Sequence, residues 1–291
     1  MNCKFRTVKN FKCLQLVRPS KQLITSEFRY VLFVYFFLMM CLFQKDVYSQ
    51  ECKIRNNSWK NGESINYHVY YTLAGIYVYG GEANFSVKLN AHNNNPAYYI
   101  RGEGKTNSFF DGFFKVRDRY ESFIDTTTLQ PFKFIRNIEE GDFKKYETVS
   151  FNHQSNLAVT KSGTYKVPDC TQDVLSMIYY SRNIDFSAYK SGAKIAFSMF
   201  IDDQVHNLYI RYLGKELVKT RYGKFRAIKF KPLLIEGTIF KGGEEMTVWV
   251  TDDANRVPVR IESPISVGSV KVDMMGYSGL RYPLSSLVTK Y

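Results

Sequence analysis

The chain has 291 residues, of which 40 are Lys or Arg and 27 are Asp or Glu, so its formal net charge is +13. An apolar share of 45% and an aromatic share of 16% exclude an intrinsically disordered chain. With 18 Gly and 8 Pro the chain is not collagen-like, and 5 Cys are too few for a disulfide-dense scaffold. The length allows one large domain or two small ones.

The first 49 residues have the pattern of a secretory signal. Residues 30–43 form an uncharged apolar run with seven basic residues before it, and a bilayer-spanning helix would need about 20 apolar residues. Val47 and Ser49 suit the two recognition positions of a signal peptidase site, which predicts cleavage after Ser49 and one exported domain over residues 50–291. An uncleaved membrane anchor is the alternative. A lipoprotein site at Cys41 is disfavoured, because Met residues rather than small ones precede it.

Removal of this leader would halve the net charge. Residues 1–49 hold eight basic and two acidic residues, so the rest of the chain keeps 32 and 25, a net charge of +7. That charge favours solubility and attraction to an anionic membrane surface. Lys115, Arg117 and Arg119 would share one face of a strand, a pattern typical of a solvated sheet face, with anion binding as the alternative. We expect no nucleic-acid partner, because residues 225–231, which combine basic and aromatic side chains, alternate as an ordinary strand and the chain is predicted to be exported.

Alternation of polar and apolar residues predicts strands through most of the chain. The first group covers residues 64–71, 80–89, 97–106, 113–125, 132–139, 144–152 and 156–160, with a loop over residues 90–95. The second group covers residues 194–201, 205–213, 216–221, 225–232, 238–240, 245–251, 257–262 and 269–276. No linker, charge block or repeat divides the exported part, so we expect a single antiparallel β domain.

One segment between the two groups has helical spacing. Within residues 168–182, Val174, Leu175, Ile178 and Tyr179 form one apolar stripe, which predicts a helix of about three turns with an N-cap at Thr171. Sheets of about a dozen strands tend to curl or close. The predicted fold is therefore all-β: a large antiparallel curled sheet or incomplete β-barrel, with one helix packed on its concave face.

Four phenylalanines gather around a predicted turn, at Phe109, Phe110, Phe113 and Phe114. The favoured interpretation is that they cap the core under a loop. The functional alternative is the lip of an apolar cavity, because lipophilic ligands bind in concave aromatic walls. If they were exposed, they would form an interaction site. Together with Ile178 and Tyr179 of the helix, they are the candidate ligand-binding residues.

The residues that usually carry metal or nucleophilic chemistry are scattered. His68, His92, His153 and His206 lie far apart, and neither a His-x-x-x-His nor a Cys-x-x-Cys spacing occurs. The chain also lacks the Gly-x-Ser-x-Gly elbow and the phosphate-binding loop. We therefore expect no enzyme activity, no metal and no cofactor.

Acidic residues offer the remaining route to catalysis. The pairs Asp202-Asp203 and Asp252-Asp253 are typical of hairpin turns, where acids bond to their own backbone. A hydrolase built from Asp118, Glu121 and Glu139 would require two of these acids to meet in one pocket. This is the least favoured function.

Cys52 and Cys170 are the two cysteines outside the leader. Two cysteines in an exported protein suggest one disulfide between the N-terminus and the middle of the chain. The alternative, that they never meet, stays open.

Four motifs are spread along the chain: GESINY at 62–67, FKVRDRYES at 114–122, DVLSMIYYSR at 173–182 and VWVTDD at 248–253. Together they resemble a bacterial envelope family known as domain of unknown function family 3108, over nearly all of residues 60–275. Cys52 and Cys170 are similar to cysteines of Bacteroidetes-type members. The resemblance implies export and a β-rich fold, with no established activity. A looser similarity to periplasmic lipoprotein carriers implies an incomplete barrel with a helix over an apolar cavity.

The sequence therefore predicts an exported protein that is periplasmic or envelope-associated. We expect a non-enzymatic domain whose concave sheet binds a lipophilic or lipid-linked ligand, so that a lipid or a lipoprotein is the expected partner. The alternative is a structural or partner-binding module in cell-envelope assembly. In that case a second envelope protein would be the partner and the loop at residues 109–114 would be exposed.

Overall fold

The computed structural model describes residues 47–48, 54–73, 75–236, 242–265 and 268–291. The compact unit runs from Asp46 to Tyr291. Apart from Val47 and Tyr48, the predicted leader lies outside the described residues, so its cleavage stays a prediction. The predicted strand at residues 238–240 also lies outside them.

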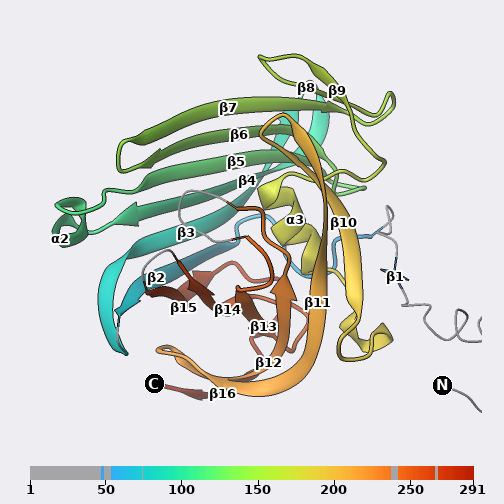
Figure 1. The fold of residues 1–291 in the computed structure, drawn as a ribbon. Coiled ribbons are helices and arrows are strands. Elements are labelled where there is room, and N and C mark those ends of the chain that lie inside the picture. The colour runs from blue at the N-terminus through green and yellow to red at the C-terminus, as the bar shows by residue number, and fades with distance from the viewer. Residues whose placement is uncertain (1–46, 49–53, 74, 237–241, 266–267) are drawn as a thin grey trace, which may run out of the picture. The chain divides into compact units, whose positions relative to one another are not determined.

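Within the described residues, sixteen strands form one sheet (Figure 1). They are β1 (Val47–Tyr48), β2 (Ser64–Leu73), β3 (Ile76–His92), β4 (Asn95–Thr106), β5 (Arg117–Asp125), β6 (Pro131–Glu140), β7 (Phe143–Asn152), β8 (Leu157–Val159), β9 (Thr164–Lys166), β10 (Lys194–Ile201), β11 (Gln204–Lys219), β12 (Gly223–Pro232), β13 (Thr247–Thr251), β14 (Pro258–Pro264), β15 (Ser269–Ser278) and β16 (Leu287–Lys290). The order across the sheet is β1-β10-β11-β12-β13-β14-β15-β2-β3-β4-β5-β6-β7-β8-β9, and β16 pairs with β12. Neighbouring strands are antiparallel, except that β1 runs parallel to β10.

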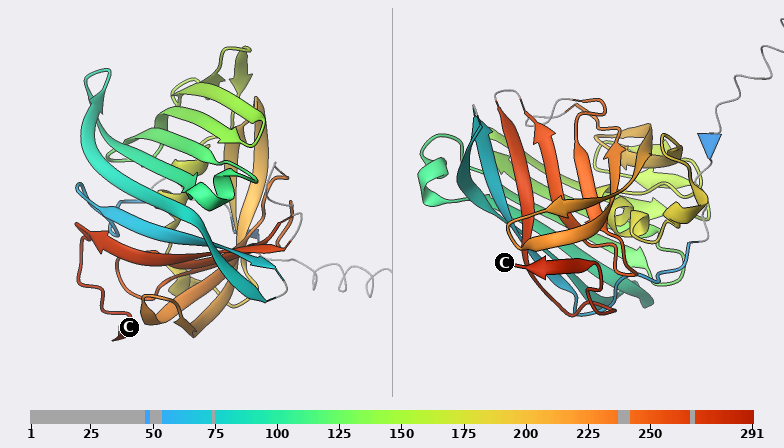
Figure 2. Two further views of the ribbon diagram at one scale, coloured as in Figure 1. Left: turned by 90° about the vertical axis from the view of Figure 1, so that its left-hand side faces the viewer. Right: turned by 90° about the horizontal axis from the view of Figure 1, so that it is seen from below.

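The sheet curls without closing into a barrel (Figure 2). The strand order ends at β1 and at β9, and these two strands do not pair with each other. The β10–β11 turn instead contacts β6 and the end of β8 through side chains. Asp202 in that turn pairs with Arg136 of β6, and Thr160 donates a hydrogen bond of 2.7 Å to Asp203. The prediction of a curled sheet or incomplete barrel is confirmed.

Two predicted breaks in the strands are wrong. The loop expected at residues 90–95 is a two-residue hairpin turn, in which Asn93 and Asn94 have φ angles of 49° and 65°. Asn tolerates this left-handed backbone, so the strands extend to the turn itself. The strands expected at 205–213 and 216–221 are one strand, β11, which absorbs an extra residue in a bulge before Gly214 (φ 104°).

The described helices are α2 (Ser108–Asp111), α3 (Val174–Ser181) and the short 3₁₀ helix η1 (Phe186–Ala188). The predicted helix is α3, but it has eight residues rather than three turns, and its N-cap is Asp173 rather than Thr171. Asp173 accepts a hydrogen bond from the Ser176 N–H, and Ser176 bonds back to the Asp173 backbone. The Thr171 hydroxyl does not cap the helix, because it donates a hydrogen bond of 2.7 Å to the Pro168 carbonyl, which precedes it in the chain.

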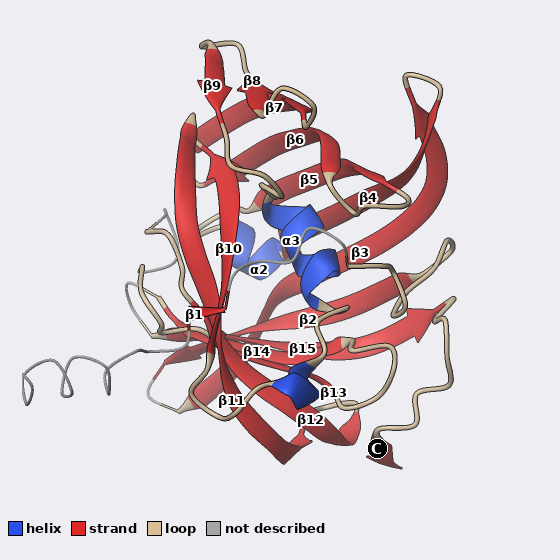
Figure 3. Cartoon of the chain, turned by 90° about the vertical axis from the view of Figure 1, so that its right-hand side faces the viewer, coloured by secondary structure: helices blue, strands red, loops and turns tan. Residues whose placement is uncertain are grey.

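Helix α3 packs on the concave face of the sheet, against β4, β5 and β10 (Figure 3). Leu175 is buried over Gly102, where an added Cβ would lie 3.2 Å from the Leu175 side chain. The Ser122 hydroxyl of β5 donates to the Asp173 carboxylate at 2.6 Å. Both contacts hold the start of the helix against the sheet, which confirms the predicted position of the helix.

Candidate functional site

The six predicted ligand-binding residues do not form one site. Phe109 and Phe110 belong to α2, and Phe113 and Phe114 follow it, in the connection between the ends of β4 and β5. Ile178 and Tyr179 belong to α3, inside the curl (Figure 1). The expected cavity lip around α3 is therefore not formed by these phenylalanines.

Helix α2 presents its phenylalanines to solvent. Phe109, Phe113 and Phe114 are 64%, 76% and 45% exposed. The helix starts at Asn107, whose side chain accepts from the Phe110 N–H at 3.0 Å and donates to the Tyr79 carbonyl at 2.7 Å. The interpretation of these residues as a core cap under a loop is wrong for Phe109, Phe113 and Phe114, because all three side chains are exposed.

A second exposed group adjoins α2. Residues 76–79, at the hairpin between β2 and β3, are exposed, and their side chains are those of Ile, Tyr, Val and Tyr. The ring of Phe110 lies 6.1 Å from that of Tyr71 on this hairpin, and the Asn107 N–H donates to the Gly80 carbonyl at 2.9 Å. We call this surface, Phe109, Phe113, Phe114 and residues 76–79, the aromatic tip. The sequence analysis missed the hairpin half, although its aromatic residues were visible.

Charged residues beside the aromatic tip are paired with one another. Arg117 binds Asp111 at 2.6 Å, and Lys105 binds Glu82 at 2.8 Å. The hydrogen bond from Arg117 lowers the pKa of Asp111 below its ordinary value. Lys115 binds Glu139 at 3.2 Å. These charged side chains remain partly exposed, but each has a partner of opposite charge beside the apolar side chains of the tip.

The α3 half of the predicted site is a buried polar cluster. Tyr179 is 1% exposed, and its ring lies 5.1 Å from that of Trp59. Beside it, Arg182 forms a two-pronged ion pair with Glu63, at 2.5 and 2.9 Å, and both side chains are almost completely buried. Burial raises the pKa of Tyr179 well above its ordinary value. Such an enclosed cluster holds α3 to the N-terminal segment and leaves no room for a ligand at Tyr179.

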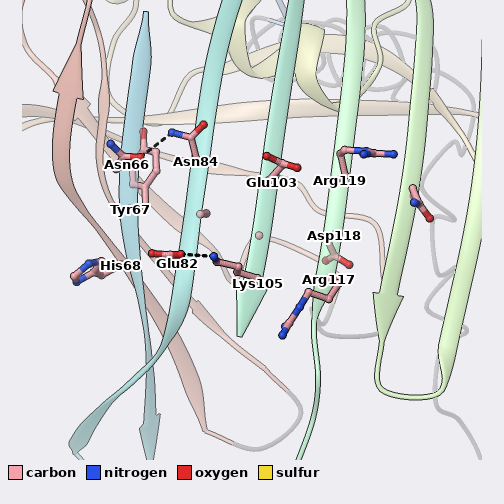
Figure 4. A pocket seen from close by; sticks show the side chains of 13 residues that line it. Asn66, Tyr67, His68, Glu82, Asn84, Glu103, Lys105, Arg117, Asp118 and Arg119 are labelled. Carbon is pink, nitrogen blue, oxygen red and sulfur yellow. Dashed lines mark hydrogen bonds and ion pairs between the residues drawn. The ribbon is translucent and has the colours of Figure 1, made fainter. Parts of the chain in front are cut away.

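A polar groove of about 530 Å³ lies on the opposite face of β2–β6 from α3 (Figure 4). Its walls carry amides and charges that already bond to each other: Asn84 donates to Asn66 at 2.7 Å, and Lys105 pairs with Glu82. Arg117 and Arg119 line the groove, whereas Lys115 of the predicted basic stripe precedes β5. Because these charges are neutralised in place, the groove has the character of a solvated sheet face.

The acids proposed for hydrolysis do not meet. Asp118 is half-buried and contacts Glu140, while Glu121 pairs with Arg119 and Glu139 pairs with Lys115. Burial, with the nearby Glu140, raises the pKa of Asp118 to about 7. The three expected acids therefore give no catalytic pair, and the perturbed group is the Asp118–Glu140 contact that the sequence analysis did not anticipate.

The histidines, paired acids and cysteines named in the sequence analysis do not form a metal site in the described residues. In the described part of the chain, no three His, Cys, Asp or Glu side chains gather as metal ligands. Asp202 is a turn residue, as predicted, but it also pairs with Arg136 and Lys145 across the gap in the sheet. Cys170 is buried, whereas Cys52 lies outside the described residues, so their disulfide stays a prediction. Among the described helices, none is long and apolar enough to cross a bilayer.

Known structures with a similar arrangement share little sequence with the chain. A β-barrel-like protein of domain of unknown function DUF1849 from Brucella abortus is 10% identical, with a TM-score of 0.51, over 76% of this chain and 99% of that one. This likeness concerns the fold alone. A candidate lipoprotein from Parabacteroides distasonis (10% identity, TM-score 0.34, 79% and 100% coverage) and a candidate exported protein with a YmcC-like fold from Bacteroides fragilis (10%, 0.32, 78% and 100%) are more distant.

No curated protein matches the chain. A family model matches residues 66–275, which include β3–β14 and most of β2 and β15, together with both the aromatic tip and α3. The match confirms the resemblance carried by the motifs around Asn66, Arg117 and Trp249. The chain belongs to the family described as protein of unknown function, DUF3108.

Proposed function

We propose that this protein is a non-enzymatic, exported envelope protein that binds the surface of a lipid bilayer through its aromatic tip. The observation that carries the proposal is the exposure of Phe109 and Phe113 beside the exposed hairpin 76–79. Single exposed apolar residues are ordinary, but a contiguous group marks an interaction site or a membrane contact.

The position of the tip favours a bilayer over an internal lipid cavity. Helix α3 occupies the concave face, where the side chains of Leu175, Met177 and Tyr179 are buried in the core. Helix α2 instead projects beyond the ends of strands β4 and β5 (Figure 2). A projecting aromatic surface can enter the fluid interfacial layer of a membrane, where aromatic side chains are enriched.

Charge and the predicted leader agree with this placement. The signal-like pattern before Ser49 would deliver the domain to the envelope, and the remaining chain would carry a net charge of +7. Such a charge attracts a protein toward anionic lipid headgroups. Asp111, Glu82 and Glu139 lie beside the tip and each has a basic partner, so their negative charges repel an anionic membrane surface only weakly.

The test is binding to vesicles of phosphatidylglycerol and phosphatidylethanolamine, measured by co-sedimentation. We expect the wild-type protein to bind, and Phe109→Ser with Phe113→Ser to weaken partitioning by about tenfold or more, because two rings lose their apolar burial. Both rings are mainly exposed, so the thermal unfolding temperature should hardly change.

The control removes exposed apolar side chains elsewhere. Leu89 and Val159 are 57% and 44% exposed and lie outside the tip, so Leu89→Ser with Val159→Ser should leave vesicle binding as it is. If the control and the tip variant lost vesicle binding equally, the loss would come from lower overall surface hydrophobicity and not from the tip. No binding by the wild-type protein would refute the proposal and leave the module that binds an envelope protein as the remaining function.

A further inference from the structure

The polar groove over β2–β6 holds its side chains in two rows that cross the strands (Figure 4). Its lining comes entirely from these five strands, at positions that the structure describes. In each row the strand register places one residue directly beside the next, so the rows follow from strand pairing and not from a loop. The first row is Asn66, Asn84, Glu103, Arg119 and Asn137, and the second is His68, Glu82, Lys105 and Arg117.

The acidic and basic side chains of both rows are neutralised by ion pairs. The pairs are Lys105 with Glu82, Arg117 with Asp111, Arg119 with Glu121, and Arg101 with Glu103. Each acidic or basic side chain in the two rows thus has a partner of opposite charge, either in the groove or beside it. A charged ligand would have to displace one of these partners, whereas a neutral ligand would not. The groove therefore favours an uncharged ligand.

Three amides provide the neutral hydrogen-bonding groups of the first row. Asn66 and Asn137 are exposed at its two ends, and Asn84 donates to Asn66 at 2.7 Å. This bond uses one donor of Asn84 and the oxygen of Asn66, so the Asn66 NH₂ group can still donate and the Asn84 oxygen can still accept. A hydroxyl group also donates and accepts hydrogen bonds. The row therefore matches a ligand that carries hydroxyl groups along its length.

An exposed aromatic side chain adjoins the groove on two sides. Tyr146 of β7 lies directly opposite Asn137 in the strand register, so it continues the first row on the same face, and it is 69% exposed. On the other side, the ring centroids of Tyr79 and His68 lie 4.8 Å apart, and Tyr79 is 40% exposed. The face of an aromatic ring packs favourably against C–H groups, whose hydrogens are weakly positive. The groove thus combines hydrogen-bonding amides with flanking aromatic rings.

We propose that this groove binds a short neutral oligosaccharide, laid across strands β2–β7 along the first row. A sugar ring carries hydroxyl groups around its rim and C–H groups on its faces, so one ligand would use both the amides and Tyr146. Neighbouring strands lie about 4.8 Å apart, which gives a row of roughly 24 Å from Asn66 to Tyr146. The groove volume of about 530 Å³ lies within the range of roughly 300–1,000 Å³ that is usual for small-molecule sites.

Titration calorimetry of the exported protein with three soluble tetrasaccharides tests the proposal. Cellotetraose and chitotetraose are neutral chains of glucose and of N-acetylglucosamine, and tetragalacturonate is an acidic chain of the same length. We expect saturable binding of at least one neutral chain. Tetragalacturonate should bind about tenfold more weakly than that chain, because its carboxylates would enter a groove that holds Glu82 and Glu103 and whose basic side chains are already paired.

Variants at exposed positions separate the two kinds of contact. Tyr146→Ser removes the ring and should weaken binding of the neutral chain by about tenfold, whereas Tyr146→Phe keeps the ring and should bind as the wild type does. Asn137→Ala removes one amide and should weaken binding by about fivefold. The matched control is Asn90→Ala, because Asn90 is exposed on the same face of β3 outside the groove. The unfolding temperature should hardly change in any of them.

Three results would overturn the proposal. The first is that neither neutral chain binds, and the second is that neither Tyr146→Ser nor Asn137→Ala lowers the affinity. The third is that tetragalacturonate binds more tightly than both neutral chains, which would assign the groove to an anionic ligand instead. Vesicle binding depends on the aromatic tip, so failure at the groove would leave the proposed function untouched.

Discussion

The ion pair between Glu63 and Arg182 is the most enclosed charge contact of the domain. Arg182 ends α3 and also donates to the Asn255 carbonyl at 2.9 Å, so one guanidinium joins the N-terminal segment, the helix and the loop after β13. A buried charge whose partner is removed costs about 3–5 kcal/mol, because it stays desolvated without compensation. This contact therefore links three distant parts of the chain.

We expect Glu63→Gln to lower the free energy of unfolding by about 3 kcal/mol or more in denaturant titration, because it leaves the Arg182 charge buried and uncompensated. Adding Arg182→Met in the same chain should recover part of the loss, since no unpaired charge then remains. If Glu63→Gln changed stability by less than about 1 kcal/mol, the pair would behave as a solvated surface contact.

The carboxyl of Asp118 gives the domain a pH dependence. Its pKa, about 7, is raised by burial and by Glu140, whereas an unfolded chain has a value near 3.9. Between about pH 4 and pH 7 the native state thus holds a proton that the unfolded state releases, and the free energy of unfolding falls as pH rises.

Asp118→Asn should flatten this fall and raise the unfolding temperature at pH 8 relative to the wild type, measured by calorimetry across pH. A remaining slope is expected from Asp173, whose buried carboxyl has a pKa raised to about 6. Asp142→Asn, at an exposed neighbouring turn, is the matched control. An unchanged slope in Asp118→Asn would mean that this carboxyl is already ionised in the folded protein.

At the scale of elements, periodicity located the strands and the helix because each depends on local pattern. The ends were less predictable, as α3 shows: Thr171 and Asp173 are both suitable caps, and only the Pro168 contact removes Thr171 from the choice. Short β16 was missed because its four residues depend on pairing with β12. Helix α2 was missed because its single turn is fixed by Asn107 reaching Tyr79 across the fold.

At the scale of the molecule, the curl follows from strand number, whereas the location of each candidate surface depends on contacts that no local pattern contains. Glu63 and Arg182 lie 119 residues apart, and the neutralising partners of Arg117 and Lys105 come from other elements. The sequence singled out the four phenylalanines, but not their exposure, which depends on how α2 docks against β3. Whether they bind a ligand stays a prediction.

The predicted disulfide between Cys52 and Cys170 would connect two distant parts of the molecule. Cys170 lies two residues before Gln172, which bridges to the edge of β10, so a link to Cys52 would hold the new N-terminus near that edge. Closing a loop of more than 100 residues stabilises the folded state by up to about 4–5 kcal/mol through the entropy of the unfolded chain.

Non-reducing peptide mapping of the exported protein should recover Cys52 joined to Cys170. Cys52→Ala should lower the unfolding temperature, and reductant should lower that of the wild type by a similar amount while leaving the variant unchanged. Free thiols at both positions would contradict the link.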